Sequence, residues 1–363
     1  MAVNKEIRPV AVMCFSSGTG GMERSAVRLA EALSKISEVT LLCKKGSFTQ
    51  KHYDEGDYPF ACETVSYMSR TFSPSMMFQV RAIIDKRDIK NVIFFGASEL
   101  KTLYFSYLGK DLNVTVWHGT TKSRPKRDAF HRLVYSCVDQ HVAISKHLER
   151  NVKQIVPITE PEKYRVIRPS FNFDENDKPV DNKDSECLNI VHVGRVAQGK
   201  GQVDAVKACQ GLHEAGIRFS LSLVGGSEGD DYMNELIQAV ESSAYRSSIN
   251  MEGYVEDVNA YLKKADVFLF PSSGEGMPGS YIEALHFGLI CVSYDNTVFP
   301  EFLEMGFHVH IVKNKSVDAL AKKLCDIAAS LEVEKEKSSS NIELAKHSFS
   351  EVHEISEWLE VLE

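Results

Sequence analysis

Residues 267–283 read VFLFPSSGEGMPGSYIE, and this run is the most informative part of the 363-residue chain. Its apolar start, residues 267–270, is typical of a buried strand, and the proline, serines and glycine that follow indicate a loop. Pro278 is suited to opening a helix, because its ring fixes φ near the helical value and the first helical N–H needs no partner. The run therefore predicts a strand, a loop and a helix in succession.

Two carboxylates lie eight positions apart across the start of this expected helix. Glu275 falls on the loop at the positive end of the helix dipole, and Glu283 falls about one turn inside. Free N–H groups at a helix start attract phosphate, and a carboxylate one turn in can accept paired hydrogen bonds from sugar or ribose hydroxyls. This arrangement favours a nucleotide-sugar site. The alternative is that both glutamates only complement the helix dipole.

A second loop of this kind carries two cations. Residues 191–201 read VHVGRVAQGKG, in which a strand runs into a glycine-rich turn followed by a helical pattern of apolar residues. Arg195 and Lys200 lie on that turn, where backbone and side-chain donors can converge on a diphosphate.

A third glycine turn lies near the amino terminus. Residues 18–24 read GTGGMER, and they separate the apolar strand 10–15 from an amphipathic helix. One interpretation of Gly20 and Gly21 is that they only let this strand and helix pack closely.

In this order along the chain, the three patterns resemble the retaining glycosyltransferases of family 4, which have the GT-B fold, and the resemblance covers nearly the whole chain. It implies an α/β protein with two Rossmann-like domains facing across a cleft. It also implies an enzyme that moves a sugar from a nucleotide diphosphate-sugar, most often a UDP-sugar, to a glycan or lipid-linked acceptor. The expected setting is the biosynthesis of bacterial surface polysaccharide: lipopolysaccharide, O-antigen or capsule.

The resemblance assigns roles to the quoted residues. Gly20 and Gly21 would face the cleft and let the backbone approach donor phosphate and acceptor. The ribose would lie on Glu283 and the sugar near Glu275, and catalysis would stabilise the leaving diphosphate without a carboxylate nucleophile. The diphosphate would lie on two cations and the helix start, namely Arg195, Lys200, Met277, Pro278 and Gly279.

Neither a cofactor nor a metal ion is expected. The chain has no Asp-x-Asp pattern, so Arg195 and Lys200 are expected to supply the charge that a divalent ion would supply. The eight cysteines form no Cys-x-x-Cys pair, which argues against zinc and favours a reducing compartment.

His118 is a further catalytic candidate. It follows an expected buried strand and should point from its carboxyl end into the cleft, where the resembled family has a comparable histidine that contacts the sugar or acceptor. The alternative is a histidine whose ring is satisfied by backbone groups. Ser145 ends another strand and is expected to cap the next helix.

The length predicts two domains, because single cores stop growing at roughly 250–300 residues. Residues 1–170 form the expected acceptor domain, with a helix 341–363 packing back on it; residues 187–340 form the donor domain, and the polar residues 171–186 form a linker. Strands are expected near 10–15, 38–43, 91–95, 113–117, 140–144, 188–193, 217–224, 267–270 and 290–294. Helices are expected near 23–35, 74–87, 98–109, 126–136, 145–153, 202–214, 231–244, 257–264 and 279–287.

Charge divides unevenly between the two halves. Residues 1–168 hold 26 Lys and Arg against 17 Asp and Glu, a net of +9, whereas residues 169–363 have a net of -17. Residues 122–153 are rich in cations, which predicts either reversible binding to an anionic membrane or only a solvated face. No nucleic acid partner is expected. The apolar run near the amino terminus is too short for a signal peptide, so the expected location is the cytoplasm, either free or peripheral on the inner face of the cytoplasmic membrane.

Three other functions fit parts of the pattern: a GT-B-fold epimerase or phosphorylase, a non-catalytic binding subunit with the same fold, and a NAD-dependent oxidoreductase. The glycine turn resembles the NAD fingerprint only loosely, because no acidic residue stands at a suitable strand end about 20 residues on.

Overall fold

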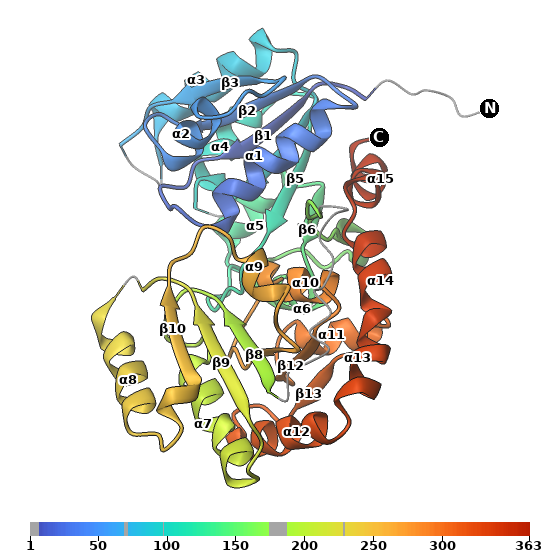
Figure 1. Ribbon diagram of the computed structural model, residues 1–363. Helices are drawn as coiled ribbons and strands as arrows, with labels where there is room; N and C mark the ends of the chain where they lie inside the picture. The colour runs from blue at the N-terminus through green and yellow to red at the C-terminus, as the bar shows by residue number, and fades with distance from the viewer. Residues whose placement is uncertain (1–6, 69–71, 97, 174–186, 228) are drawn as a thin grey trace, which may run out of the picture. The chain divides into compact units, whose positions relative to one another are not determined.

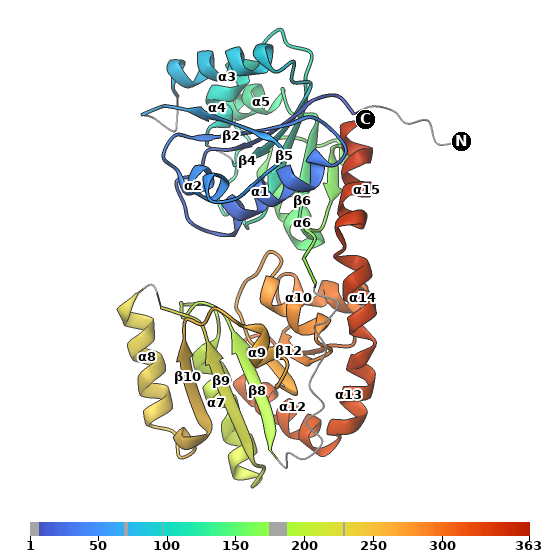
Figure 2. The same cartoon turned by 45° about the horizontal axis from the view of Figure 1, so that its top comes forward.

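The computed structural model describes residues 7–68, 72–96, 98–173, 187–227 and 229–363 (Figure 1). The chain divides into two compact units. Unit 1 comprises the residues up to Ser170 together with Glu351–Glu363, and unit 2 comprises Phe171–Ser350. Each unit is a Rossmann-like parallel sheet with helices packed on it, which confirms the expected fold class (Figures 1 and 2).

Unit 1 is built on a seven-stranded parallel sheet in the order β3-β2-β1-β4-β5-β6-β7. The order reverses between β1 and β4, and open α/β sheets bind ligands at such a reversal, beyond the carboxyl ends of the strands. The turn after β1 holds Gly20 and Gly21. The strands are β1 (Val10–Cys14), β2 (Val39–Lys44), β3 (Ala61–Val65), β4 (Asn91–Phe95), β5 (Asn113–His118), β6 (Gln140–Ala143) and β7 (Tyr164–Val166). The helices are α1 (Gly21–Ser34), α2 (Phe48–Asp54), α3 (Pro74–Lys86), α4 (Leu100–Tyr107), α5 (Ala129–Tyr135), α6 (Lys146–Ile155) and α15 (Glu351–Leu362).

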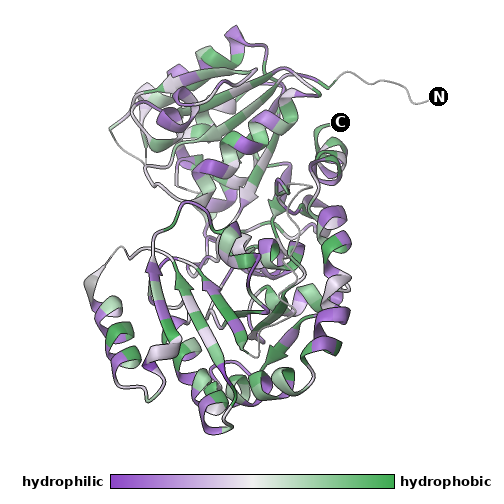
Figure 3. Ribbon diagram, viewed as in Figure 1, coloured by the Kyte–Doolittle hydropathy of each residue, from purple (hydrophilic) through white to green (hydrophobic). Residues whose placement is uncertain are grey.

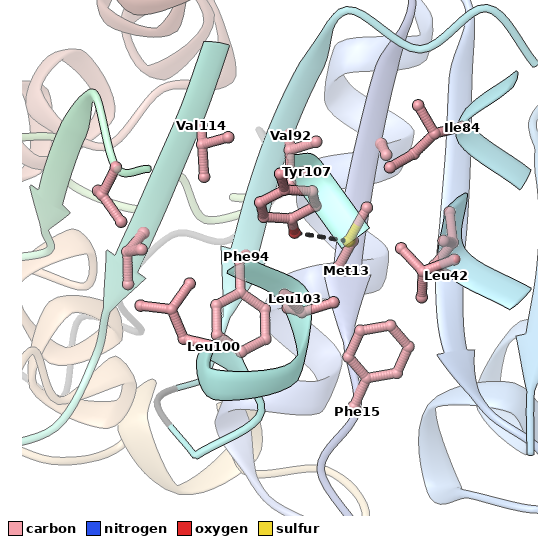
Figure 4. Packing of buried hydrophobic residues seen from close by; sticks show 14 of the residues in the cluster. Met13, Phe15, Leu42, Ile84, Val92, Phe94, Leu100, Leu103, Tyr107 and Val114 are labelled. Carbon is pink, nitrogen blue, oxygen red and sulfur yellow. Dashed lines mark hydrogen bonds between the residues drawn. The ribbon is translucent and has the colours of Figure 1, made fainter. Parts of the chain in front are cut away.

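The central strands of unit 1 are continuous apolar runs, as expected where helices cover a parallel sheet. Every residue of β1 and β4 is buried. Helix α4 places Leu103 near Phe94, and the Tyr107 hydroxyl donates to the Met13 sulfur at 3.4 Å (Figure 4). This packing fixes the strands that carry the turns of unit 1.

Unit 2 is built on a six-stranded parallel sheet in the order β10-β9-β8-β11-β12-β13. Here the order reverses between β8 and β11, so the loops after these two strands lie next to each other. The strands are β8 (Leu188–Val193), β9 (Phe219–Val224), β10 (Ile249–Gly253), β11 (Val267–Phe270), β12 (Ile290–Tyr294) and β13 (His310–Val312). The helices are α7 (Gln202–Glu214), α8 (Asp230–Glu241), α9 (Asn259–Leu262), α10 (Gly279–His286), α11 (Phe299–Glu304), α12 (Val317–Ala329), α13 (Leu331–Ser339) and α14 (Asn341–Ser348).

The hydropathy pattern follows this architecture. The strands are mainly hydrophobic, and the helices carry hydrophobic and hydrophilic residues on different sides (Figure 3). No helix in the described ranges combines the length and the apolar character that a bilayer crossing needs.

The strands and helices expected from the sequence are all present, with ends that differ by a few residues. The expected helix 341–363, however, is two helices: α14 belongs to unit 2 and only α15 belongs to unit 1. The break falls at Phe349 and Ser350: Phe349 has the non-helical angles φ -120° and ψ 25°, and its carbonyl accepts the N–H of Phe171 at 2.9 Å. Phe171 and Phe173 of the expected linker belong to unit 2, and residues 174–186 lie outside the described ranges.

Helix α15 is held in unit 1 by an ion pair. The Arg28 guanidinium donates to both carboxylate oxygens of Glu354, at 2.5 and 2.9 Å, and Asn113 donates to the Val361 carbonyl at 2.8 Å. These bonds explain why the last helix of the chain belongs to the amino-terminal fold.

Candidate functional site

The loops after β8 and β11 are joined by hydrogen bonds in unit 2. The Gly199 carbonyl accepts from the backbone N–H of Ser273 at 2.8 Å and from the Ser272 hydroxyl at 3.0 Å. Gly201 has φ of 83°, and a Cβ there would lie 2.2 Å from the Pro271 carbonyl oxygen, so only glycine fits this approach. The glycines of this turn therefore have a packing role: they let the two loops meet.

Lys200 and Glu275 meet where these loops touch. The Lys200 Nζ lies 2.8 Å from Glu275 Oε1, and the Ser272 hydroxyl donates to the same oxygen at 2.6 Å. Only 11% of the Glu275 side chain is exposed, against 28% for Lys200. The sequence places both residues at strand ends but does not indicate that they form an ion pair.

A residue that the sequence analysis did not identify also holds Glu275. The backbone N–H of Glu275 donates to the Thr297 hydroxyl oxygen at 3.1 Å. Thr297 has φ of 46°, a left-handed conformation that costs a residue with a side chain about 1–2 kcal/mol. Such strain concentrates at functional sites. The polar turn Asp295-Asn296-Thr297 directly after the expected strand 290–294 was the available signal.

Helix α10 presents a start that no side chain caps. Pro278 occupies the capping position before Gly279, and the described residues provide no side-chain hydrogen bond to the first turn. The Ser280 hydroxyl donates to the Val193 carbonyl at 3.0 Å, which ties this turn to the end of β8. Met277 is half-buried on the preceding loop. The free N–H groups and the dipole make the helix start suited to an anion.

Glu283 lies on α10, as expected, and its carboxylate is largely buried. Burial raises the pKa of Glu283, and no hydrogen bond or ion pair from the described residues offsets it. A buried carboxylate without donors is suited to accept hydrogen bonds from a ligand. Arg195 lies exposed on the loop that carries Lys200, and the Gln202 side chain donates to its carbonyl at 2.9 Å.

Gly20 and Gly21 begin helix α1 in unit 1. The Gly20 N–H donates to the buried carboxylate of Glu23 at 2.9 Å. A Cβ on Gly21 would meet no atom within 4 Å, so packing of the strand and the helix does not require glycine there. The open space instead agrees with a backbone that a ligand approaches.

His118 is buried, whereas the sequence predicted that its ring points from the strand end into the cleft. It is the last residue of β5 and is 1% exposed. Its Nε2 lies 3.0 Å from His141 Nδ1, and its Nδ1 lies 2.6 Å from Lys122 Nζ. The alternative of a ring satisfied by backbone groups is wrong, because both ring nitrogens lie beside side chains. Burial, then the charge of Lys122, lowers the pKa of His118 well below its usual range.

Ser145 caps helix α6, as expected: its hydroxyl oxygen accepts the N–H of Leu148 at 3.3 Å.

Known proteins are similar to almost the whole chain. The family model described as Glycosyltransferase Family 4 matches residues 19–175, and the model described as Glycosyl transferases group 1 matches residues 173–342. The amylovoran biosynthesis glycosyltransferase AmsK of Erwinia amylovora is 25% identical over 247 residues, which are 62% of this chain and 60% of that relative.

Two solved structures are similar over 98% of the chain. A glycosyltransferase of Rickettsia africae superposes with a TM-score of 0.84 at 16% identity, over 98% of its chain. HepE of Anabaena in complex with UDP superposes with a TM-score of 0.81 at 14% identity, over 99% of its chain. At these identities the structural likeness concerns the fold.

Proposed function

Because the chain belongs to the GT-B glycosyltransferases of group 1, we propose that it transfers a sugar from a nucleotide diphosphate-sugar to a glycan or lipid-linked acceptor. We assign it to bacterial surface polysaccharide biosynthesis, since the Erwinia relative acts in amylovoran biosynthesis. A UDP-sugar is the proposed donor, and the UDP complex of the Anabaena neighbour supports this choice.

The observation that carries the proposal is the arrangement at the carboxyl edge of the sheet in unit 2. The β8 and β11 loops, which are hydrogen-bonded to each other, carry the Lys200–Glu275 ion pair. Helix α10 follows the β11 loop and adds an uncapped helix start and the uncompensated carboxylate of Glu283. Cations and helix N–H groups bind a diphosphate, and a carboxylate binds the hydroxyls of a ribose. One nucleotide sugar uses all of these groups.

In the proposed mechanism, the chain's residues act on the leaving diphosphate. Lys200, Arg195 and the N–H groups of α10 stabilise the negative charge that develops as the bond to the sugar breaks. Glu275, held by Lys200 and Ser272, accepts a sugar hydroxyl hydrogen and orients the ring. We propose retention on one face of the sugar, with a leaving phosphate oxygen taking the acceptor proton, so that no carboxylate nucleophile is needed.

Substituting Glu283 by Gln is expected to weaken donor binding and to leave turnover at saturating donor within a few fold. The amide keeps one oxygen but loses the charge that strengthens hydrogen bonds to hydroxyls by about 1.5 kcal/mol or more, roughly tenfold in the Kd for UDP. Calorimetric titration with UDP measures it. Glu336→Gln on the exposed side of α13 is the matched control. Equal UDP affinity in all three proteins would contradict the ribose assignment.

Turnover is expected to persist in excess EDTA, because Lys200 and Arg195 supply the positive charge that a divalent ion would supply. Release of UDP from a panel of UDP-sugars, with and without EDTA, measures this. Loss of turnover in EDTA and its return with Mn²⁺ would show that a metal ion takes part.

The same assay separates this proposal from its two remaining alternatives. An epimerase converts the donor sugar without net release of UDP, and a non-catalytic subunit binds UDP without consuming a donor. Acceptor-dependent release of UDP is the result that the proposed transfer requires.

We also propose that residues 122–153 bind an anionic membrane surface, through the cations of this segment that are exposed. The Lys122 Nζ lies 2.6 Å from His118 Nδ1, and the Lys153 Nζ lies 2.9 Å from Glu149 Oε1, so both ammonium groups are engaged by other side chains. The cations with exposed side chains are Arg124, Arg127, Arg132, Lys146 and Arg150, and Arg127 also donates to the Lys153 carbonyl at 2.8 Å. Helix α5, which carries Arg132, also exposes two apolar side chains, Phe130 and Leu133, which are 48% and 49% exposed. Cations beside exposed apolar groups are typical of surfaces that lie on anionic lipid.

The double variant Arg124→Glu/Arg127→Glu is expected to lose co-sedimentation with vesicles that contain anionic lipid. Each cation near such a surface contributes about 1 kcal/mol, so reversing two removes at least a factor of about 30 in partitioning. Lys313→Glu/Lys322→Glu, exposed in unit 2, makes the same change in net charge. If both double variants lose vesicle binding equally, or if the unaltered protein does not bind vesicles at low salt, residues 122–153 are only a solvated face and the membrane proposal is wrong.

A further inference from the structure

Two histidines and one glutamate converge in unit 2, on a part of the fold that the proposed reaction does not use. His308 Nε2 and His310 Nε2 each lie 2.8 Å from the same carboxylate oxygen, Oε2 of Glu334. The two histidines come from the start of β13 and the residues before it, and the glutamate comes from α13. The three ligand atoms lie within 4.8 Å of one another.

The hydrogen bonds of the present arrangement occupy the atoms that a metal ion would use. An ionised carboxylate only accepts, so each Nε2 carries a proton that it donates to Glu334 Oε2. In the metal-bound form each neutral imidazole would carry its proton on Nδ1 instead and present the lone pair of Nε2 to the ion.

Neighbouring groups hold the three side chains in place. Asn341 accepts the backbone N–H of His308 at 2.8 Å and donates to its carbonyl at 2.9 Å, which fixes the backbone that carries this histidine. Lys337 donates to the other Glu334 oxygen, Oε1, at 2.9 Å. Such outer contacts orient metal ligands and contribute to metal affinity.

We propose that His308, His310 and Glu334 form a binding site for a divalent transition-metal ion of the zinc class. Two imidazole nitrogens and one carboxylate oxygen are the ligand set of open zinc sites, in which water completes the coordination. At zinc–ligand distances of about 2.0–2.2 Å, tetrahedral ligands lie roughly 3.4 Å apart, so the present 2.8 Å separations need to widen by about half an ångström. The side chains of His308, His310 and Glu334 are 31%, 15% and 11% exposed, which leaves an entry route from solvent.

The bound ion would cross-link β13 to α13, as Glu334 now does through hydrogen bonds. It would act on the stability of unit 2 and is independent of the charge that Lys200 and Arg195 supply to the proposed reaction. Sequence patterns did not indicate this site, because Glu334 lies 24 residues beyond His310 in the chain.

The test is titration of the full chain, stripped with EDTA and free of nucleotide, with Zn²⁺ and separately with Co²⁺. The expected result is one equivalent of bound zinc, a rise in the midpoint of thermal unfolding, and cobalt d–d absorption without a sulfur charge-transfer band. The absence of that band distinguishes this site from the neighbouring thiols of Cys43 and Cys62, which lie 3.7 Å apart in unit 1.

The variants His308→Gln and His310→Gln separate metal binding from hydrogen bonding. Glutamine can still donate a hydrogen bond to Glu334 but is a poor zinc ligand. Each variant is expected to keep the unfolding midpoint of the metal-free protein and to weaken zinc binding at least tenfold. Lys337→Gln changes a residue that contacts Glu334 but is not a proposed ligand, and it is expected to weaken zinc binding less. The proposal fails if the unaltered protein binds no stoichiometric zinc, or if both histidine variants bind it equally well.

Discussion

The substitution Lys200→Ala is expected to lower turnover by a hundredfold or more. A unit charge about 4 Å from a phosphate contributes roughly 4 kcal/mol at an effective dielectric constant of 20, and each 1.4 kcal/mol is a factor of ten in rate. The structure adds a second loss, because Lys200 is the counter-ion of Glu275, whose side chain is only 11% exposed. Without the ammonium group, Glu275 faces the donor diphosphate as an uncompensated negative charge.

A comparison of four proteins tests this explanation. Steady-state rates are measured for the unaltered chain, Lys200→Ala, Glu275→Gln and the double variant. If the pair acts as one unit, the double variant loses much less than the product of the two single losses. Lys207→Ala, exposed further along α7, is the matched control and is expected to keep the normal rate. A rate of Lys200→Ala close to that of the control would overturn the assignment of Lys200 to the diphosphate.

The sequence was sufficient to predict which loops form the candidate site. Buried parallel strands are continuous apolar runs, so strands such as 188–193 and 267–270 could be located closely, and the polar loops after them followed. The pairing of Lys200 with Glu275 could not be predicted, because 75 residues separate them and only the adjacency of β8 and β11 brings them together. Thr297 was missed for the same reason.

Short elements at the sheet edges were not predicted. β3 is largely half-exposed and β7 is only three residues long, so neither has a long apolar run or a clear alternation. β10 and β13 are edge strands of the same kind. The direction of a side chain at a strand end was equally hidden: His118 could have faced solvent, and only the structure shows that Lys122 and His141 enclose it.

Lys122 has a strongly lowered pKa and lies in a chain of contacts with His118 and His141. It is the only described lysine whose pKa falls to about 7, mainly because it is buried and secondarily because Lys126 is near. Its Nζ lies 2.6 Å from His118 Nδ1. If Lys122 donates there, His118 carries its proton on Nε2 and donates to His141 Nδ1. The remaining nitrogen, His141 Nε2, is buried without a partner in the described part of the chain. With a Lys122 pKa of about 7, the three groups are all neutral once the pH rises above that value.

This burial makes the stability of unit 1 depend on pH. The unfolded lysine has a pKa of about 10.4, so between pH 7 and 10 the unfolded chain binds a proton that the folded chain does not. Stability contributed by this group therefore rises with pH across that range. Below pH 7 the Lys122 side chain is protonated in both the folded and the unfolded chain, so the folded chain bears the full free-energy cost of burying the charged ammonium group. At about 1.4 kcal/mol per pKa unit, the penalty amounts to roughly 3–5 kcal/mol.

The variant Lys122→Met is expected to remove this dependence. At pH 7 it should unfold about 5–15 °C higher than the unaltered protein, after roughly 1 kcal/mol is deducted for the lost hydrogen bond to His118, and the difference should shrink toward pH 10.

Both tryptophans of the chain, Trp117 and Trp358, lie in unit 1, so their fluorescence follows the unfolding of this unit. Cysteines and tyrosines that titrate in the same range contribute equally to both proteins, so the difference between the two isolates Lys122. Lys45→Met, at an exposed position, controls for the loss of one charge. A constant difference between Lys122→Met and the unaltered protein from pH 7 to 10 would mean that Lys122 keeps its proton in the folded state, and the neutral Lys122–His118–His141 chain would then be wrong.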